Sequence, residues 1–596
     1  MNERIFVGVD DLFYNQQDDD NKISYKLIDN TTSDDDILDM INNVLESKVI
    51  SVDTETTGLD PHTCKTRLVQ IGVRSPKKEI YVIDCFKVRN VNDLITTLMC
   101  NPNTIKIMHN GKFDYEFIKT SFGCDIKGII FDTMLAAKLL NFDGLPNYRL
   151  DGLCKYYLNT IISKTEQKSN WSGNLSESQL NYAAIDVLLL HDLRNILRNQ
   201  LIKNNMQKVT NIEMQCLKAV AEIELAGMKL DVDKWSILSD RLDRELELIE
   251  KPLQVYLPGV NLNSDKQLLQ YIKSHFPELI TLEATNVETL NKYNHDMLTL
   301  LTKYNKASKA VNTYGKNILE FVNPVTGRIH GSFWQIGCRT GRFSCKEPNL
   351  QNIPRTKEYR SCFIPEKGNV FIICDYSAIE LRTTSEVSKE PVMIEAFKNG
   401  EDLHKRTAMI VSGKPLEEIT KEMRQAAKAL NFGLVYYIQP PTLKEYASNN
   451  YGVNMTLQEA INYRIKYFNS YKVLAKWHEH MKDKCKKSRT LQTRTGRIRD
   501  WGKWSPSLTE YINYEPQSLS ADITKLALVY LYDKFNNTDI KIIGTTHDEV
   551  QVECPISKGE EVKYIVKTIM EQAGGEILKT VPVVAEASIC TSWADK

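Results

Sequence analysis

The stretch Val370-Phe371-Ile372-Ile373-Cys374-Asp375-Tyr376-Ser377-Ala378-Ile379-Glu380-Leu381-Arg382 decides the fold of this chain. An apolar, β-branched run of strand length ends at Asp375, and helical spacing of apolar residues follows it. Asp375 is therefore expected at the carboxyl end of a strand, a natural place for a metal ligand. The alternative is that Asp375 caps the following helix, because Asp, Ser and Thr are favoured at that position. The stretch alone leaves both interpretations open.

Length and composition indicate a soluble protein of several domains. The 596 residues predict about three to five domains at roughly 100–200 residues each. The content of 42% hydrophobic and 26% charged residues is ordinary for globular proteins, and no apolar run approaches the roughly 18 residues of a membrane span. Residues 1–13 lack a basic segment followed by an apolar core, so we expect no targeting signal, although a longer precursor could have lost one.

Cysteine spacing and charge restrict the kinds of site to be expected. The 13 cysteines form no C-x-x-C pair and are odd in number, which favours reduced thiols and predicts no structural zinc. Lys plus Arg equals Asp plus Glu at 76 each. A protein of this balance that binds phosphates must separate basic grooves from acidic metal sites.

Carboxylates in the first third of the chain are spaced as in a metal-dependent site. Val49 to Glu55 reads as a strand whose alternation puts Asp53 and Glu55 on one face. A second strand, Leu68 to Val73, follows, and His109 to Asp114 opens a helix. Tyr182 and Asp186 lie at i and i+4, on one helix face. Each piece alone is commonplace, since a D-x-E is mostly a solvated strand end.

Together the ordered motifs D-x-E, N-x-x-x-D and Y-x-x-x-D resemble the tyrosine subclass of the DEDD proofreading 3′→5′ exonucleases. Phosphodiester hydrolysis uses two divalent ions about 4 Å apart, and hard cations take oxygen ligands. The resemblance implies that metals are held by Asp53, Glu55, Asp114 and Asp186. It also implies that Tyr182 orients the attacking water and that Asn110 and Leu59 contact the strand end.

The middle of the chain is predominantly helical. Apolar spacing predicts a helix over Asn211–Ala226, a break at Gly227, a long helix from Val232 to about Tyr256, and a helix capped near Ser264. Lysines 303, 306, 309 and 316 alternate with Tyr304 and Tyr314; for any single lysine a solvated helix face is the better interpretation. In the polymerase family that the motifs of the next region resemble, this region is the thumb that grips the duplex.

The last 260 or so residues carry the decisive resemblance. Thr340-Gly341-Arg342-Phe343-Ser344, Pro348 to Pro354, Asp375 to Arg382, Arg424 to Tyr436 and His547-Asp548-Glu549 follow one another as in family A DNA polymerases. From about residue 26 the chain resembles the large fragment of bacterial DNA polymerase one. We therefore expect a multidomain α/β protein: a ribonuclease H-like exonuclease domain, then a right-hand polymerase with an antiparallel palm sheet and helical fingers and thumb.

The spacing of four between Arg424, Lys428, Phe432 and Tyr436 predicts a slowly spiralling stripe on one helix. Two cations followed by two aromatic rings suit a nucleotide lying along the helix. The resemblance implies that Arg424 and Lys428 bind phosphates, that Lys428 is a general acid for pyrophosphate, and that Phe432 packs on the sugar. A Phe at this position implies discrimination against dideoxynucleotides.

Further nucleotide and DNA contacts follow from the same resemblance. Glu380 with Tyr436 blocks a ribose 2′-OH, so the product should be DNA, and His404 contacts the triphosphate unless it is only a surface residue at a helix start. Tyr376, next to Asp375, is also expected at the nucleotide. Minor-groove acceptors are alike on every Watson–Crick pair; the expected readers of the primer terminus are Arg342 and Gln517, with Asn513 at the template.

Two strand-like runs flank His547-Asp548-Glu549, so the acidic pair should occupy a hairpin turn. Antiparallel to the strand ending at Asp375, the hairpin would bring Asp548 beside it as the second metal ligand, with Glu549 behind. One ion would activate the primer 3′-OH and the other would bridge the triphosphate. With these partners, the cap interpretation remains only for Ser377.

The chain departs from the family pattern at Tyr437, which replaces a glycine, at Ser518-Leu519, which replace Gly-Thr, and at Thr509, where an arginine is frequent. These departures bear on fidelity, template handling and speed rather than on the reaction. Nothing before residue 26 resembles a 5′-nuclease, so we expect none.

We predict an N-terminal extension (1–25), an exonuclease domain (26–205), a thumb with connecting helices (206–335), palm (336–400 and 501–596) and fingers (401–500). Each site should take two Mg²⁺ ions, for which Mn²⁺ can substitute. Primer-template DNA and deoxynucleoside triphosphates are the expected partners of a monomer that avoids membranes; helicase or other replisome proteins remain open.

Several readings of origin and function are compatible with the sequence. The chain would work in a bacterium, a phage-infected host cytoplasm, or a plastid or apicoplast. The runner-up function is a 3′→5′ exonuclease whose polymerase half mainly holds DNA, and a DNA-binding scaffold is the non-enzyme alternative. Both are disfavoured because the polymerase carboxylates and the basic stripe are present together.

Overall fold

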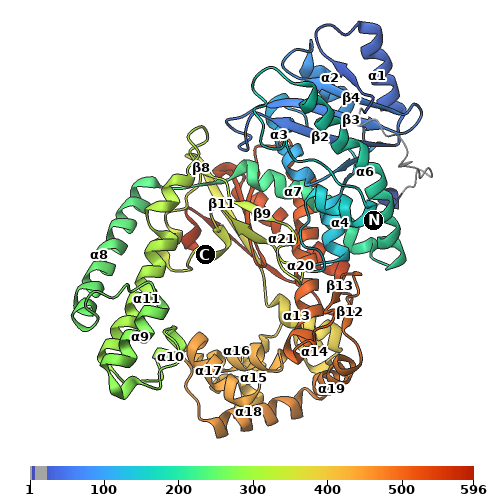
Figure 1. The fold of residues 1–596 in the computed structure, drawn as a ribbon. Helices are drawn as coiled ribbons and strands as arrows, with labels where there is room; N and C mark the ends of the chain where they lie inside the picture. Colours follow the sequence, from blue (N-terminus) through green and yellow to red (C-terminus); the bar gives the residue numbers. More distant parts are fainter. Residues whose placement is uncertain (1–2, 7–22) are drawn as a thin grey trace. The chain divides into compact units, whose positions relative to one another are not determined.

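A computed structural model describes residues 3–6 and 23–596, so the expected extension over residues 1–25 lies almost wholly outside the described residues. The chain divides into two compact units (Figure 1). The first comprises Met1–Ala226, Phe333–Cys345 and Ile372–Ile589, and the second comprises Gly227–Ser332, Lys346–Phe371 and Cys590–Lys596.

A mixed six-stranded sheet, ordered β1-β4-β3-β2-β5-β6, organises the N-terminal part of the first unit. Strands β2, β3 and β4 are antiparallel, whereas β1 pairs with β4, β5 with β2 and β6 with β5 in parallel. Every residue of β3 is buried, because helices cover the sheet. The strands are β1 (Lys26–Ile28), β2 (Val49–Thr56), β3 (Thr66–Val73), β4 (Glu79–Asp84), β5 (Ile105–Met108) and β6 (Ile130–Asp132).

The helices of this part follow the strands in the chain, and α6 packs across β2, β3 and β4. They are α1 (Asp34–Glu46), α2 (Val91–Met99), α3 (Gly111–Phe122), α4 (Thr133–Leu140), α5 (Leu150–Leu153), α6 (Glu177–Lys203) and α7 (Gln207–Ala226). The predicted helix over 211–226 is thus confirmed and is longer at its start. It belongs to the first compact unit.

The deciding stretch forms the middle of a four-stranded sheet ordered β14-β15-β11-β16. Its strands are β11 (Asn369–Tyr376), β14 (Lys541–Thr546), β15 (Glu549–Pro555) and β16 (Ala585–Cys590). The long helices α20 (Leu508–Phe535) and α21 (Gly559–Ile577) pack on one another, and both contact β15. Residues 370–374 are buried because β11 has neighbours on both edges and helices over the sheet.

Seven helices and a small hairpin lie between β11 and α20 in the sequence. They are α13 (Ile379–Ser388), α14 (Pro391–Lys398), α15 (Leu403–Ser412), α16 (Lys421–Val435), α17 (Pro440–Tyr451), α18 (Leu457–Ser470), α19 (Lys472–Lys487), β12 (Thr490–Gln492) and β13 (Ile498–Asp500). Helices α13 to α19 share one hydrophobic core that includes Leu430, Leu434, Leu443, Tyr467 and Leu474.

The second unit holds its own hydrophobic core, which lies among α8, α9, α10 and α11. The predicted helix from Val232 to Tyr256 and the Ser264 cap are confirmed. Tyr304 is buried in this core, whereas lysines 303, 306, 309 and 316 are exposed, as expected of a solvated face. The elements are β7 (Met228–Lys229), α8 (Val232–Tyr256), α9 (Asp265–His275), α10 (Val287–Leu290), α11 (Asp296–Tyr314), β8 (Arg328–Ile329) and α12 (Lys357–Arg360); β9 (Ser332–Trp334) and β10 (Ser344–Lys346) border both units.

The cap expected at Ser377 is wrong. Helix α13 begins at Ile379, and its N-cap is Ala378, in the left-handed region with φ +52° and without a side-chain cap bond. The Ser377 N–H instead donates to the Val584 carbonyl at 2.9 Å. The connection after β11 is so tight that it leaves no place for a side-chain cap.

The departure at Tyr437 has a backbone explanation. Helix α16 ends with the Tyr437 N–H donating to Leu434 O and the Ile438 N–H donating to Gly433 O, the paired bonds of a Schellman motif. The motif needs a left-handed residue, and Tyr437 has φ +61°. A glycine fits this position without strain, whereas Tyr437 is held by its ring packing edge-on against His478 and by a hydrogen bond to Glu479.

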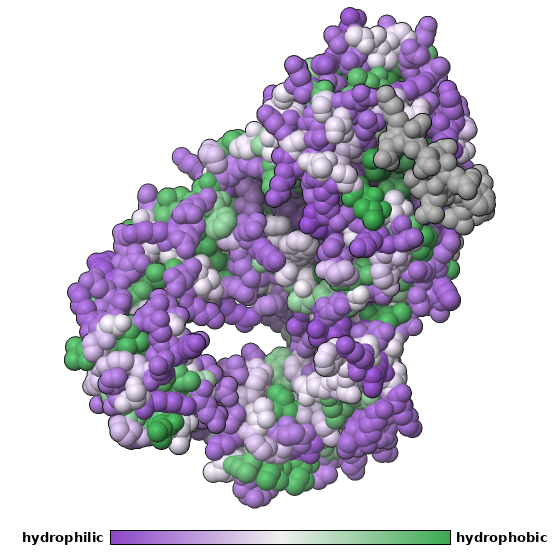
Figure 2. Space-filling model, viewed as in Figure 1, coloured by the Kyte–Doolittle hydropathy of each residue, from purple (hydrophilic) through white to green (hydrophobic). Residues whose placement is uncertain are grey.

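Among the described residues, no helix combines the length and apolarity needed to cross a bilayer. On the face shown in Figure 2, hydrophilic side chains predominate and hydrophobic ones occur in small separate groups.

A cluster of polar side chains joins helix α3 to helix α20. Asp125 accepts hydrogen bonds from Tyr115 at 2.7 Å, Tyr532 at 2.9 Å and Asn536 at 2.7 Å, and it pairs with Lys127. Although burial opposes ionisation, these bonds hold the pKa of Asp125 well below its usual range. The cluster is therefore a charged anchor between the two sheets of the first unit.

Replacing Asp125→Ala should lower the melting temperature of the protein clearly, because three hydrogen-bond donors and a lysine lose this acceptor. Hydrogen bonds to a charged group each contribute about 1.5–3 kcal/mol. Thermal unfolding followed by circular dichroism measures the effect. Asp539→Ala, which removes an exposed pair with Lys558, is the matched control and should leave the melting temperature unchanged; equal melting of the two variants would contradict the anchor.

Candidate active sites

The first carboxylate cluster lies where strand β2 meets helix α6. Asp53 and Glu55 project from β2, and Asp186 comes from α6. One oxygen from each of these carboxylates lies within 4.8 Å of the others. The alternation of the strand and the packing of α6 on the sheet thus bring together three of the four predicted exonuclease ligands.

This cluster is unfavourable without a counter-charge. Burial, with the neighbouring Asp186, raises the pKa of Asp53, and burial with three neighbouring carboxylates raises the pKa of Glu55 to about 10. Burial raises the pKa of Asp186 to about 7, although a hydrogen bond from Tyr182 acts against the shift. Carboxylates crowded in this way require protons or cations. The oxygen-only donor set fits a hard divalent ion.

Asp114 lies beside the cluster on α3. It is buried and accepts a hydrogen bond from Thr54 Oγ1 at 2.7 Å, and burial together with Asp53 raises its pKa. Asn110 begins α3 in the left-handed conformation, where the Gly111 N–H donates to Asp132 at 2.8 Å. Sequence analysis did not identify Thr54 or Asp132 as supports of this helix.

Leu59, expected at the strand end, is 85% exposed in the segment that follows β2. A fully exposed leucine is available to a ligand at little cost. Tyr182 is half-buried, and the centroid of its ring lies 6.5 Å from that of Trp171.

The second carboxylate pair is formed by the palm sheet. Asp375 is the penultimate residue of β11, and Asp548 lies in the turn between β14 and β15. The Tyr376 N–H donates to the Asp548 carbonyl at 3.3 Å, which ties the end of β11 to that turn. Glu549 is already the first residue of β15 rather than part of the turn, and it accepts a bond from Gln551 at 2.6 Å.

The side chain of Tyr376 anchors the strand. It is 2% exposed, and its hydroxyl donates to the Met570 carbonyl on α21 at 2.9 Å. The ring is therefore buried beside the strand, and the backbone of Tyr376 contacts the turn that holds Asp548.

Arg342 and Glu380 form an ion pair near the palm carboxylates. Burial and the Asp548 charge raise the pKa of Glu380 to about 7, and burial lowers the pKa of Arg342. Burial and the neighbouring Tyr451 raise the pKa of Tyr446, on α17, and the Glu380 charge adds to the shift. Tyr446 was not foreseen from the sequence.

The predicted stripe on α16 is present. Arg424, Lys428, Phe432 and Tyr436 are each half-buried, whereas Leu430 and Leu434 on the opposite face are buried in the helical core. The stripe therefore lies along the open edge of the helix, where a ligand can reach it.

His404 joins α15 to the stripe. It is 8% exposed, its Nδ1 lies 2.9 Å from Asn431 Nδ2, and its ring lies 5.8 Å from that of Phe432. Burial lowers the pKa of His404 to about 4, and Arg424 and Lys428 also lower it. Asp402, which caps α15, also accepts a 2.7 Å hydrogen bond from Arg424. An aspartate at the start of a predicted helix is the sequence signal that could have identified Asp402.

Helix α20 exposes little along its first half. Asn513 and Gln517, four residues apart, are half-buried among buried neighbours, and Asn513 Oδ1 has no hydrogen-bond partner. Ser518 and Leu519 are fully buried, so these departures from the family pattern affect packing, whereas Thr509 is exposed.

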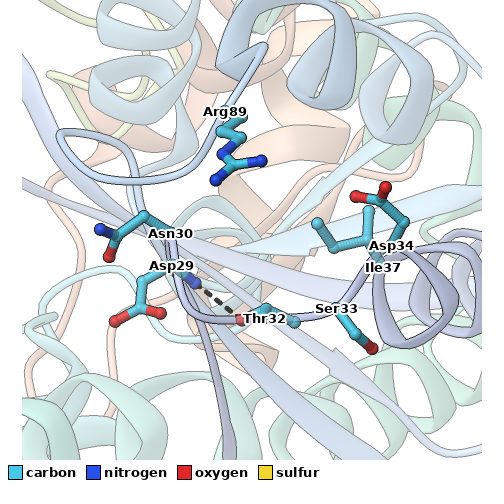
Figure 3. Close-up of a pocket in the computed structure, with 7 residues that line it drawn as sticks. All are labelled: Asp29, Asn30, Thr32, Ser33, Asp34, Ile37 and Arg89. Atoms are coloured by element: carbon cyan, nitrogen blue, oxygen red, sulfur yellow. Dashed lines mark hydrogen bonds between the residues drawn. The ribbon is translucent and has the colours of Figure 1, made fainter.

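A separate polar pocket of about 230 Å³ lies at the carboxyl end of β1 (Figure 3). Its lining comprises Asp29, Asn30, Thr32, Ser33, Asp34, Ile37 and Arg89. Strand β1 is at the sheet edge, three positions from β2, so this pocket contributes nothing to either carboxylate set.

With both sites described, the comparisons with known proteins become informative. Residues 28–202 match the family described as 3′-5′ exonuclease, and residues 232–595 match the family described as DNA polymerase family A. The chain belongs to DNA polymerase family A. This family A polymerase is therefore an enzyme with a polymerase and a 3′–5′ exonuclease domain, as the resemblance of the motifs predicted.

Similar proteins agree with this placement of the family A polymerase. DNA polymerase I of Aquifex aeolicus is 34% identical over 592 residues, which are 94% of this chain and 98% of that protein. DNA polymerase I of Borreliella burgdorferi is 31% identical over 94% of this chain but only 63% of its own length. The POL domain of Pol1 from M. smegmatis, in complex with DNA primer-template and dNTP, has the same fold with a TM-score of 0.81, 23% identity and coverage of 95% and 99%.

Divalent ions should stabilise the wild-type polymerase more than an Asp186→Asn variant. Neutralising Asp186 relieves repulsion in the metal-free cluster but removes a ligand, so the variant should melt higher than wild type in EDTA and gain less from Mg²⁺ or Mn²⁺. Differential scanning fluorimetry measures both effects. Asp375→Asn is the control for ions bound in the palm, and an equal Mg²⁺ gain in wild type and Asp186→Asn would argue against a metal site at this cluster.

Proposed function

We propose that this family A polymerase extends the 3′ end of a primer on a DNA template at Asp375 and Asp548, and removes misincorporated nucleotides at Asp53, Glu55, Asp114 and Asp186. The observation that supports the proposal is the backbone bond from Tyr376 to Asp548, because it ties the strand end that carries Asp375 to the turn that carries Asp548.

Asp375 and Asp548 are proposed to hold two divalent ions, Mg²⁺ with Mn²⁺ as a substitute, and the exonuclease carboxylates to hold another two. The bound ions would lower the pKa of the attacking hydroxyl or water and neutralise charge on the leaving oxygen. The donor sets fit, since all ligands are carboxylate oxygens and the exonuclease set is crowded.

The incoming nucleotide is proposed to lie along α16. Arg424, Lys428 and His404 are grouped at one end of the stripe, which suits a triphosphate, and the low pKa of His404 makes it a neutral hydrogen-bond donor there. In the reaction the primer O3′ forms a bond to the α-phosphorus and the bond to pyrophosphate breaks. Lys428 would give a proton to the departing pyrophosphate.

Phe432 and Tyr436 continue the stripe towards the sugar and base. Phe432 packs against His404, which fixes its ring for contact with a deoxyribose. Glu380 would exclude a ribose 2′-OH together with Tyr436, so the substrates would be deoxynucleoside triphosphates. Glu549 supports the turn from behind through its bond with Gln551.

Arg342, Gln517 and Asn513 are proposed to contact the end of the duplex from the minor groove. Their side-chain N–H donors are suited to the minor-groove acceptors that every Watson–Crick pair presents at the same place. In the exonuclease site, Tyr182 would orient the attacking water and Asn110 and Leu59 would hold the frayed strand end.

Primer extension distinguishes this function from that of an exonuclease whose polymerase half only binds DNA. Asp375→Ala and Asp548→Ala should each lower single-nucleotide incorporation by at least about 10³-fold, because a metal ligand is lost from the transition state. DNA affinity, measured by fluorescence anisotropy, should change little. Intact incorporation in both variants would rule out the polymerase assignment.

The exonuclease assignment is tested by the double variant Asp53→Ala with Glu55→Ala. It should abolish degradation of a mismatched 3′ end in the absence of nucleotides while leaving extension of a matched primer within about twofold. A time course with a labelled primer measures both. Loss of both activities would indicate misfolding, and retained degradation would contradict the proposed ligands.

A further inference from the structure

A fully buried network of four charged residues lies among α7, the β12–β13 hairpin and α20. Arg497 Nη2 lies 2.6 Å from Glu213 Oε1 and 2.5 Å from Asp522 Oδ1, and Lys525 Nζ lies 2.6 Å from the same Glu213 oxygen. All four side chains are at most 3% exposed. Neither reaction described above uses them.

Buried charges of this kind are costly, and packing alone would be served as well by apolar residues. The carboxylates are nevertheless closely satisfied: Thr495 donates to Asp522 at 2.6 Å, and Gln335 Nε2 donates to Glu213 Oε2 at 2.5 Å. Such a network fixes its members in one geometry. A neighbouring segment depends on that geometry.

The segment from Gln335 to Phe343, which carries Arg342, rests on the network at three points. Gln335 is bonded to Glu213, and the Lys525 ammonium lies 5.2 Å from the centre of the Phe343 ring. At Gly341, an added Cβ would lie 2.4 Å from Arg497 Cζ. Gly341 also has φ +84°, so the loop passes over the guanidinium in a conformation that favours glycine.

Hydrogen bonds within the segment connect these contacts to Arg342. The N–H groups of Gly337 and Cys338 donate to the Arg342 carbonyl at 3.0 and 3.1 Å, and the Gly341 N–H donates to Cys338 O at 2.9 Å. The backbone of Arg342 is thus part of a closed turn that lies against Arg497.

We propose that Arg497 is a positioning residue that holds Arg342 in register with the primer terminus, and that the buried network exists to fix the minor-groove check on the last base pair. The same helix, α20, carries Gln517 and Asn513 as well as Asp522 and Lys525, so all expected readers of the terminus share one rigid support. This inference rests on the proposed role of Arg342.

The test uses a primer that ends in 3-deazaguanine, which lacks the minor-groove acceptor of guanine. Wild-type enzyme should extend it about tenfold more slowly than a guanine-ended primer, because one hydrogen bond to a charged donor is lost. Arg342→Ala should extend both primers at the same low rate. A wild-type enzyme without this penalty would refute the role of Arg342, and the inference about Arg497 would fall with it.

Arg497→Lys is the informative variant, because it keeps the charge between Glu213 and Asp522 but loses the planar guanidinium that lies against Gly341. We expect it to fold, to lose the analogue penalty as Arg342→Ala does, and to add no further defect to Arg342→Ala in the double variant. If Arg497→Lys is slower on both primers but keeps the penalty, Arg497 has only a structural role and the proposal is overturned. Unchanged kinetics would also overturn it.

Arg494→Lys is the matched control. Arg494, in the same hairpin, is exposed and pairs with buried Glu386 and half-buried Glu515, so its variant should keep the penalty. If Arg497→Lys does not fold, Gly341→Ala applies the same test by pressing a Cβ onto Arg497. Loss of the penalty in that variant supports the proposal, and an intact penalty overturns it. Degradation of single-stranded DNA confirms the fold of each variant.

Discussion

One backbone hydrogen bond, from the Tyr376 N–H to the Asp548 carbonyl, sets the register on which the polymerase site depends. It joins the end of β11 to the turn before β15, so Asp375 and Asp548 approach one another although 172 residues separate them in the chain. A slip of one residue would turn the side chains of β11 to the other face of the sheet. The buried Tyr376 ring, bonded to α21, opposes such a slip.

Both candidate sites follow the same physical plan. Carboxylates come from different elements, and in the exonuclease domain the crowding of Asp53, Glu55 and Asp186 calls for protons or a cation. In the exonuclease site the raised pKa values of Glu55 and Asp186 express this repulsion directly. The packing of the surrounding sheet and helices offsets this repulsion and keeps the side chains from moving apart.

Helix α20 connects the two halves of the first unit. Along its 28 residues it presents Asn513 and Gln517 towards the expected DNA, Asp522 and Lys525 to the buried charge network, and Tyr532 to the cluster around Asp125 on the exonuclease side. A single helix of roughly 40 Å therefore carries two residues that we propose to read the primer terminus and also reaches the cluster around Asp125. Its long buried stretch explains why Ser518 and Leu519 affect packing.

The sequence by itself determined the local elements and the chemistry of the sites. Strand and helix periodicity predicted β2, β11, α8 and α16, and the ordered motifs predicted the polymerase and exonuclease family, because these signals lie within short windows of residues. The roles of the individual side chains remain proposals that the structure supports by bringing Asp53, Glu55 and Asp186 together.

Only the tertiary structure decided the supports of these sites. The left-handed Ala378 in place of a Ser377 cap, the pairing of Arg424 with Asp402, the Thr54 bond to Asp114, and the network around Arg497 could not be predicted. Each depends on partners far apart in the chain or on backbone angles imposed by packing. Sequence spacing specifies which face of an element a side chain occupies, and only the folded chain determines what lies opposite that face.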